Sequence, residues 1–367
     1  MSRNRKTTLN KHRTAPMLRK GSIFSICLLA VLMTMIPSVI FAEIFPKVGT
    51  AGLQFLKLGV DARAIGMGEA YTAVADDISS VYWNPAGLSL SRENQLMFSH
   101  TNWFANINHE FFAASRNTDF GAVALSVSFL HMDQMDITTE ELFGPTGETF
   151  SPYNLALGLT YSNQFTDRFS FGMTGKFLRE SLGWESQHTV NGVAVDLGTT
   201  YNTGWRNLII GMALTNFGPD LEYTIDNDGD GLFDEDPFDL IDNDGDGLID
   251  EDREEFPFKL PMNFSLALAV DLYRSGNNAL ISSIQLDNCV DRKETWNIGA
   301  EYKIATFAIR SGYQFNYDEA GLSLGLGWRV PVRFAIIDLD YAYTSMGDLE
   351  ETSLLSKAQR LSLKIRY

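Results

Sequence analysis

The last nine residues of the chain, 359–367, read QRLSLKIRY, and from Arg360 onward they alternate between polar and apolar side chains. The apolar set is Leu361, Leu363, Ile365 and Tyr367, and the polar set is Arg360, Ser362, Lys364 and Arg366. Successive side chains of a β-strand point to opposite faces of its sheet. We therefore predict a strand that separates an apolar environment from a polar one. The terminal Tyr367 resembles the signal by which barrel-assembly machinery recognises its clients, which makes that machinery an expected partner.

The same alternation recurs through the chain after residue 92. Fourteen segments carry it, and they start near residues 94, 106, 120, 153, 168, 190, 206, 261, 278, 294, 305, 320, 332 and 358. Each has about 9 to 14 residues, enough to cross a bilayer when tilted, and aromatic residues end many of them, as in an interfacial girdle. We predict an all-β fold, a transmembrane antiparallel β-barrel of about 14 strands over residues 93–367, with outer-membrane lipid around its apolar face.

The links between these segments differ by parity. Links after even-numbered segments are short, whereas those after odd-numbered segments include 133–152, 181–189, 219–260 and 345–357. Short periplasmic turns and long extracellular loops are typical of bacterial outer-membrane barrels. With a periplasmic N-terminus, the first strand runs outward and the long loops are extracellular. A soluble sandwich or lipocalin-like barrel is the alternative, but the number of segments and their apolar face favour the membrane barrel.

Residues 1–42 have the pattern of a secretory signal peptide. Seven Lys and Arg residues and no acid occupy positions 1–20, and an apolar run follows that ends in a small residue, Ala42. A membrane anchor is the alternative, because the run is nearly long enough to span; Pro37 and Ala42 favour cleavage. Loss of Cys27 with the signal would leave Cys289 alone, so no intrachain disulfide is expected.

Charge and motifs exclude several classes of function. The formal charge is −17, and removal of the seven signal bases makes it −24, so nucleic acid is not an expected partner. No second apolar run of about 20 residues follows the signal, which argues against a helical membrane protein. No nucleophile elbow and no zinc-binding His-Glu-x-x-His helix occurs, so we predict no enzymatic activity. We assign His109, Glu110, Glu301, Lys303 and Arg366 to lumen polarity.

Residues 51–91 interrupt the strand pattern and read AGLQFLKLGVDARAIGMGEAYTAVADDISSVYWNPAGLSLS. The small residues that recur here would let the segment approach a barrel wall closely. The stretch resembles the N-terminal signature of the PorV/PorQ family of outer-membrane proteins, which is similar in turn to the FadL-like transporters. The residues that carry the resemblance most clearly are Gly66, Gly68, Asp76, Asp77, Asn84, Pro85, Ala86 and Gly87. The resemblance implies that residues 43–92 form a plug inside a fourteen-stranded barrel. Asn84 precedes a proline, so we expect the chain to turn there, as an ordinary turn or as a gating hinge.

Three functions are compatible with this resemblance. The first is a role in type IX protein secretion or surface attachment, with secreted cargo and other secretion components as partners. The second is FadL-like passive uptake of a hydrophobic small molecule. The third is a surface adhesion or structural barrel that acts through an acidic loop. The resemblance to PorV/PorQ favours the first.

That acidic loop lies within 219–260 and contains two copies of Asp-Asn-Asp-Gly-Asp-Gly-Leu; residues 222–255 hold sixteen acids and one base, Arg253. The spacing matches an EF-hand-like loop, in which alternate acids supply hard oxygen ligands to calcium. The expected ligands are Asp226, Asp228, Asp230, the Leu232 carbonyl and Asp234 in the first copy, and Asp242, Asp244, Asp246, the Leu248 carbonyl and Asp250 in the second. Pro237 and Arg253 stand where a bidentate acid is expected, so Asp236, Asp239, Asp252 or Glu254 would have to substitute. We predict a calcium-stiffened extracellular loop; a solvated acidic loop without specific metal is the alternative.

Overall fold

The computed structural model describes residues 49–103, 106–138, 145–182, 189–223, 257–317, 321–345 and 357–367. The predicted signal peptide, 1–42, lies outside these ranges. All ten expected calcium ligands lie outside them as well, because they fall within 224–256.

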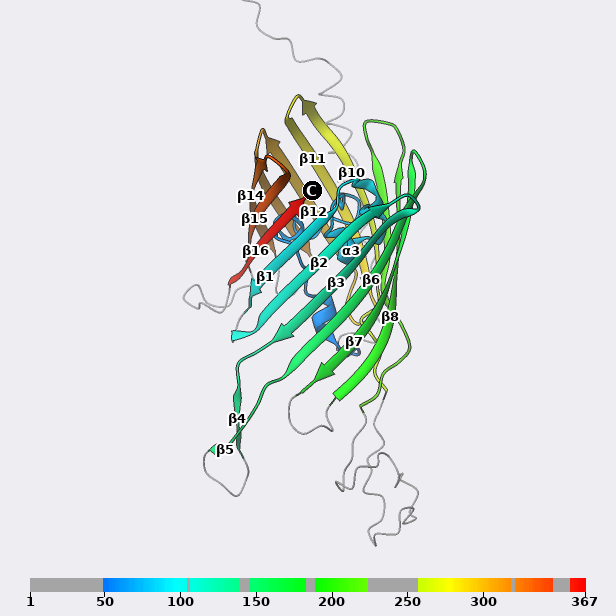
Figure 1. Cartoon of the computed structure of the whole chain (residues 1–367). Helices are drawn as coiled ribbons and strands as arrows, with labels where there is room; N and C mark the ends of the chain where they lie inside the picture. The colour runs from blue at the N-terminus through cyan, green and yellow to red at the C-terminus, as the bar shows by residue number, and fades with distance from the viewer. Residues whose placement is uncertain are drawn as a thin grey trace, which may run out of the picture. The chain divides into compact units, whose positions relative to one another are not determined.

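Fourteen antiparallel strands form a closed barrel (Figure 1). In chain order these strands are β1 (Gln95–Asn102), β2 (Asn108–Thr118), β3 (Gly121–His131), β6 (Tyr153–Thr166), β7 (Phe169–Ser181), β8 (Thr189–Asn202), β9 (Ile209–Phe217), β10 (Asn263–Ser275), β11 (Asn278–Cys289), β12 (Thr295–Ile304), β13 (Phe307–Phe315), β14 (Leu322–Val332), β15 (Ala335–Ser345) and β16 (Lys357–Arg366). Each strand pairs with its neighbour along the chain, and β1 pairs with β16 to close the sheet. The fourteen-stranded antiparallel barrel predicted from the alternation is thus confirmed.

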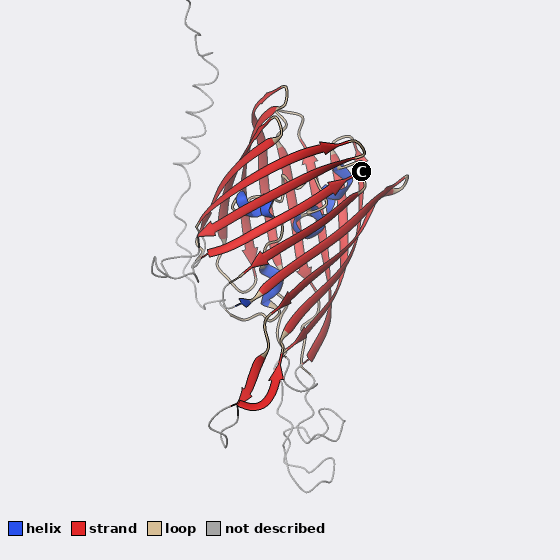
Figure 2. Cartoon of the chain, turned by 60° about the vertical axis from the view of Figure 1, so that its left-hand side comes forward, coloured by secondary structure: helices blue, strands red, loops and turns tan. Residues whose placement is uncertain are grey.

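A two-stranded hairpin, β4 (Met135–Thr138) with β5 (Pro145–Phe150), stands apart from the barrel sheet. It lies in the connection between β3 and β6 and projects beyond the barrel (Figures 1 and 2). The alternation did not predict it, because residues 133–152 were expected to form only a long loop. The short turns and the long loops gather at opposite ends of the barrel, here named the short-turn end and the long-loop end.

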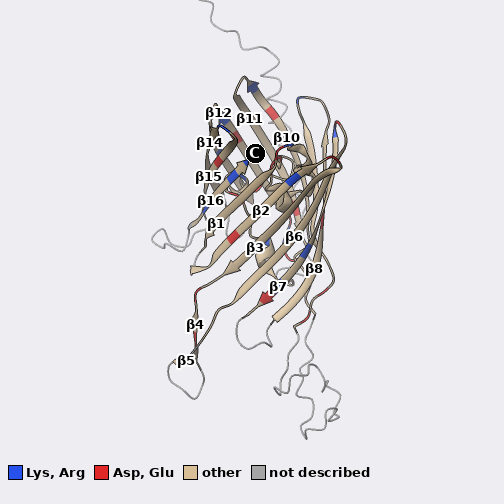
Figure 3. Ribbon diagram, viewed as in Figure 1, with Lys and Arg blue, Asp and Glu red and all other residues tan. Residues whose placement is uncertain are grey.

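The two faces of the wall differ as the alternation requires. On β16, Leu361 faces outward and is 55% exposed, whereas the next lumen-facing residue, Ser362, is fully buried. Figure 3 shows few charged residues along the strands. One assignment was wrong: Glu110 does not share the lumen with His109, since neighbours on a strand face opposite ways, and it pairs instead with His100 (Nδ1 to Oε1, 2.7 Å).

A segment before β1 fills the lumen with short helical elements (Figure 2). They are η1 (Gln54–Lys57), α2 (Ala62–Gly66), α3 (Ser80–Trp83) and η2 (Pro85–Leu90). All four have at most six residues, and none of the described helices is long and apolar enough to cross a membrane. The described part of this segment, residues 49–92, is called the plug below.

The C-terminal residue completes the barrel seam. The Tyr367 backbone N–H donates to the Asn94 carbonyl (3.0 Å), and the Asn94 N–H donates to the Tyr367 carbonyl (3.1 Å). We expect deletion of Tyr367 to lower the amount of assembled barrel without abolishing export, because it removes two seam hydrogen bonds and the terminal aromatic ring. The measurement is the heat-modifiable fraction in outer-membrane extracts. Tyr367→Phe is the control and should assemble normally; equal assembly of the deletion would contradict the expected signal.

Candidate functional site

The plug passes through the lumen from one end of the barrel to the other. At its start, the Gly52 N–H donates to the Lys259 carbonyl (3.0 Å), close to where β10 begins at the long-loop end. Just after the plug ends, Asn94 pairs with Tyr367 at the short-turn end. Between these points α2 contacts β13 to β16, and η2 contacts β3 and β6 to β8. The plug therefore bridges opposite sides of the wall.

Glycines on the lumen face of the wall receive the plug backbone. A methyl group placed on Gly312 would lie 2.1 Å from the carbonyl carbon of Met67, and one on Gly299 would lie 2.3 Å from the Met67 oxygen. On the opposite side, a methyl group placed on Gly198 of β8 would lie 2.1 Å from the side-chain oxygen of Asn84. Four more glycines of the two surfaces make similar approaches: Gly172, Gly211 and Gly325 from the wall, and Gly66 from the plug. Backbone therefore lies against backbone, which only glycine permits.

Gly66 and Gly68, the two plug glycines identified from the sequence, are each required for a different structural reason. Gly66 lies against Gly325, where a methyl group would come within 2.8 Å of the Gly325 Cα. Gly68 adopts a φ of +61°, a conformation that favours glycine, next to the backbone of Gly312. Sequence inspection identified the plug glycines but missed their partners. These wall partners could have been found from the sequence, because a glycine stands at a lumen-facing position in each of several successive strands.

The Asn-Pro-Ala-Gly run forms a capped turn that holds η2 against the wall. Asn84 is extended (φ −162°, ψ 99°), as expected before a proline, and its side chain accepts a hydrogen bond from the Ala86 N–H (3.2 Å). The Asn84 amide also donates to the carbonyls of Thr72 (2.8 Å) and Thr199 (3.1 Å). A methyl group on Gly87 would lie 2.0 Å from the Ala75 oxygen. These contacts fix two parts of the plug and strand β8 to one another.

Arg63 is the centre of an ion-pair network between the plug and the wall. Its Nη1 lies 2.6 Å from Asp76 Oδ1 and 3.0 Å from Asp77 Oδ2, both within the plug. Its Nε and Nη2 lie 3.0 and 3.1 Å from the two carboxylate oxygens of Glu301 on β12. A two-point contact between a guanidinium and a carboxylate fixes geometry as well as charge. Arg63 thus sets the position of α2 relative to β12.

The network extends from Arg63 to four other wall residues. Glu301 also accepts from Arg310 Nε (2.8 Å) and Lys303 Nζ (3.0 Å). Arg310 reaches Asp340 with its Nη1 (2.6 Å). Lys364 reaches back to the plug, where its Nζ lies 2.6 Å from Asp61 Oδ2 and 2.8 Å from Asp77 Oδ2. The nine residues Asp61, Arg63, Asp76, Asp77, Glu301, Lys303, Arg310, Asp340 and Lys364 are named the charge latch. Such buried pairs contribute little net stability but fix register, because any misplacement leaves a buried charge unpaired.

Neighbouring charges favour the charged forms of Asp77 and Arg63 in the latch. Burial raises the pKa of Asp77, but Lys364 and Arg63 more than offset it, so the pKa lies well below its usual value near 3.8. Burial lowers the pKa of Arg63, but Asp76 and Glu301 more than offset it, and the guanidinium stays charged. Asp77 has a lower pKa when the plug is seated than when it is free. Its contribution to the stability of the seated plug is therefore complete above the usual pKa and is lost only as the pH falls through the lowered pKa. Mild acid should therefore leave the Asp77 contacts charged. Asp61 differs, because burial raises the pKa of its carboxyl above the usual value.

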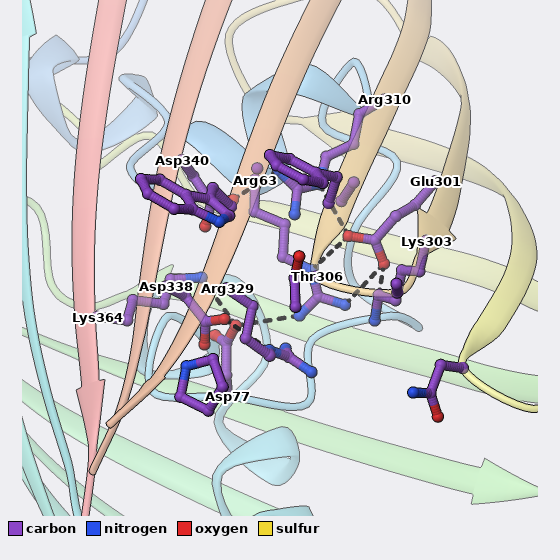
Figure 4. Close-up of a pocket in the computed structure, with 17 residues that line it drawn as sticks. Arg63, Asp77, Glu301, Lys303, Thr306, Arg310, Arg329, Asp338, Asp340 and Lys364 are labelled. Carbon is purple, nitrogen blue, oxygen red and sulfur yellow. Dashed lines mark hydrogen bonds and ion pairs between the residues drawn. The ribbon is translucent and has the colours of Figure 1, made fainter. Parts of the chain in front are cut away.

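A cavity of about 360 Å³ lies beside the latch (Figure 4). Residues of the short turns, among them Asn277 and Thr306, border it, so it lies at the short-turn end. Latch residues supply much of its lining, and Arg329 and Asp338 add a further pair (2.7 Å). The cavity is thus lined by charged residues of both the plug and the wall.

The structure brings seven of the eight expected plug residues into contact with the wall or into the latch, and Gly87 lies instead against Ala75 and Ser80 within the plug. Sequence inspection also assigned Glu301 and Lys303 to the lumen, where the structure places them. It did not identify Asp61 of the plug, or Arg310, Asp340 and Lys364 of the wall, as members of the charge latch, because contacts between distant lumen-facing residues have no sequence signal. In the described ranges no group of acids, histidines and cysteines could hold a metal ion; the acidic repeats lie outside those ranges.

Comparisons with known proteins agree with this architecture. A family described as type IX secretion system protein PorV matches residues 43–240, which include the plug and the strands up to β9. The TodX monoaromatic hydrocarbon channel deltaS2 mutant is similar in structure, with a TM-score of 0.52 and 12% identity over 84% of this chain and 97% of that one. The CymD monoaromatic hydrocarbon channel gives a TM-score of 0.50 and 13% identity over 84% and 97%. A FadL homologue of Pseudomonas aeruginosa gives 0.48 and 14% over 84% and 98%. These identities establish the fold alone. No curated protein matches the chain.

Proposed function

The chain belongs to the PorV family of type IX secretion system proteins, and from this premise we propose that it serves type IX secretion by handling exported cargo at the cell surface. It is a β-barrel of the bacterial outer membrane. The family match over the plug and half of the barrel carries the proposal. The expected partners are secreted cargo, other components of the secretion system, and the machinery that assembles the barrel.

The filled lumen supports a role for the exposed parts of the barrel. Plug and wall meet through close backbone contacts on two opposite sides, and the charge latch adds ion pairs on the side formed by β12 to β16. A folded cargo has no room to pass through such a lumen, so contact with cargo would use the loops and the rim. We propose that the long-loop end is extracellular, because short turns are periplasmic in barrels of this kind. The orientation is argued from the length of the loops and not from the N-terminus, because the plug begins at the long-loop end and not at the end proposed to be periplasmic.

FadL-like uptake is the second candidate, and the fold likeness to hydrocarbon channels is the observation in its favour. The cavity lining speaks against it, because nine of its residues are charged: Arg63, Asp77, Glu301, Lys303, Arg310, Arg329, Asp338, Asp340 and Lys364. An apolar ligand would gain little binding free energy from such a surface. Its entry would also separate charged side chains from their partners.

Deletion of the gene separates the two candidates. Under the secretion proposal, cargo with type IX sorting domains should accumulate in the periplasm or fail to attach to the surface, while growth on long-chain fatty acids stays normal. Cargo fractionation and growth curves are the measurements, and a strain complemented with the wild-type gene is the control. Normal cargo attachment together with impaired growth would transfer the assignment to uptake.

We also propose that the acidic repeats bind calcium outside the cell. Full-length protein in detergent should bind calcium in calorimetry with a dissociation constant of about 10⁻⁴ to 10⁻³ M, as extracellular calcium modules do. Asp228→Ala plus Asp244→Ala should abolish binding, because it removes one oxygen ligand from each repeat. An epitope inserted after Phe238 should be detected on intact cells. If no calcium binds at several times these calcium concentrations, the segment is a solvated acidic loop without a specific metal. The hypothesis of surface adhesion through a calcium-bound loop would then be contradicted.

A further inference from the structure

The stem of the acidic insertion turns inward and meets the start of the plug. The stem consists of residues 218–223 and 257–262, the described ends of the connection between β9 and β10. Leu221 and Phe258 exchange two backbone hydrogen bonds of 2.9 Å, which join the two halves of the stem. The residue after Phe258, Lys259, accepts from the Gly52 N–H (3.0 Å) and forms a parallel bridge with Ala51. The start of the plug is thus hydrogen-bonded to the stem.

Apolar side chains close this contact. Leu221 and Leu260 of the stem are buried with Leu53, Phe55 and Leu56 of the plug. Four lumen-facing wall residues complete the cluster: Ala156, Leu178, Val190 and Ala194. The contact is tight, since a methyl group on Gly52 would lie 2.2 Å from the Phe258 ring. Burial of several leucine and phenylalanine side chains makes the contact favourable even though it lies inside a barrel mouth.

A polar contact fixes the same part of the plug from another side. Gln54 Nε2 and Lys57 Nζ each lie 2.8 Å from Asp291 Oδ2, in the link between β11 and β12. The Cys289 thiol donates to the other oxygen of Asp291 (3.0 Å). Helix η1 is therefore held between the stem and this link, by residues other than those of the charge latch, which holds α2.

We propose that the stem is an outer clasp: it holds η1 in the long-loop mouth independently of the charge latch. The plug then has two fastenings of different chemistry, an apolar one at the long-loop end and an ionic one at the short-turn end. Separation of the two stem halves exposes residues 51–57 while α2 stays seated.

Cysteine accessibility in the purified full-length protein tests the clasp. In a Cys289→Ser background, Phe55→Cys reports on the clasp and Val74→Cys, buried near β10, reports on the inner plug. The substitution pair Leu221→Asp and Leu260→Asp places two charges in the apolar cluster. It should speed maleimide labelling at Phe55→Cys by at least about tenfold, since removal of two buried leucines costs more than the 1.4 kcal/mol that tenfold represents. Labelling at Val74→Cys should not change.

The matched control is Leu182→Asp, which adds a charge beside the same mouth at a residue that is 44% exposed. It should label as the parent does. Equal rates at Phe55→Cys in the stem variant would overturn the proposal. So would faster labelling at both reporters, because the plug would then open as one body. If the aspartate pair prevents barrel assembly, judged by heat-modifiable migration, Leu221→Ala with Leu260→Ala removes the same contacts without charge and is read in the same way.

Discussion

Replacement of Glu301 by glutamine is expected to unseat the plug and to turn a closed barrel into a conducting one. Glu301 is fully buried and receives Arg63 from the plug and Arg310 and Lys303 from the wall. Glutamine keeps the size of the side chain but leaves these buried cations without their shared carboxylate. Loss of one partner from a buried pair costs about 3–5 kcal/mol, and here it falls on the contact that positions α2.

Single-channel conductance in planar bilayers measures this effect, and protease sensitivity of the plug gives a second measurement. Glu294→Gln is the matched control, because Glu294 is an exposed acid in the link just before the same strand, β12. It should remain closed. Conductance of Glu301→Gln at the level of the control would show that the latch does not keep the plug in place.

Replacement of Gly312 by leucine is expected to have a comparable effect for a steric reason. The new Cβ would lie 2.1 Å from the Met67 carbonyl carbon and 2.2 Å from the Gly68 nitrogen. These are backbone atoms, and Met67 also lies against Gly299 of the neighbouring strand, so they cannot give way as a flexible side chain would. Strand β13 itself can accept leucine, since its pairing with β12 and β14 does not involve the side chain. The barrel should therefore assemble while the plug fails to seat.

Gly175 on β7 provides the control for this substitution. It lies on the outer face, where nothing stands within 4 Å of an added methyl group, so Gly175→Leu should assemble and stay closed. Heat-modifiable migration reports assembly, and conductance reports seating. Normal assembly and a closed lumen in Gly312→Leu would mean that the wall and plug do not need this close approach.

Local sequence determined the barrel almost completely. The alternation in segments such as QRLSLKIRY depends only on neighbours two positions apart, and the barrel's strands begin within three residues of the expected positions. A period of two is a property of the strand itself, so it can be read without any knowledge of partners. The same period assigned Lys364 to the polar face, and the plug signature identified Gly66 and Asp77 as important.

Tertiary structure alone decided what these residues touch. Asp61 and Lys364 are 303 positions apart and Arg63 and Glu301 are 238 apart, yet each pair lies in direct contact. The glycines of β8 and β13 meet opposite sides of one plug, and the stem of the insertion meets residues that precede it by about 200 positions. Closure of a sheet into a barrel brings distant lumen-facing residues together, and the alternation states which face a residue occupies but not which residue lies across the lumen.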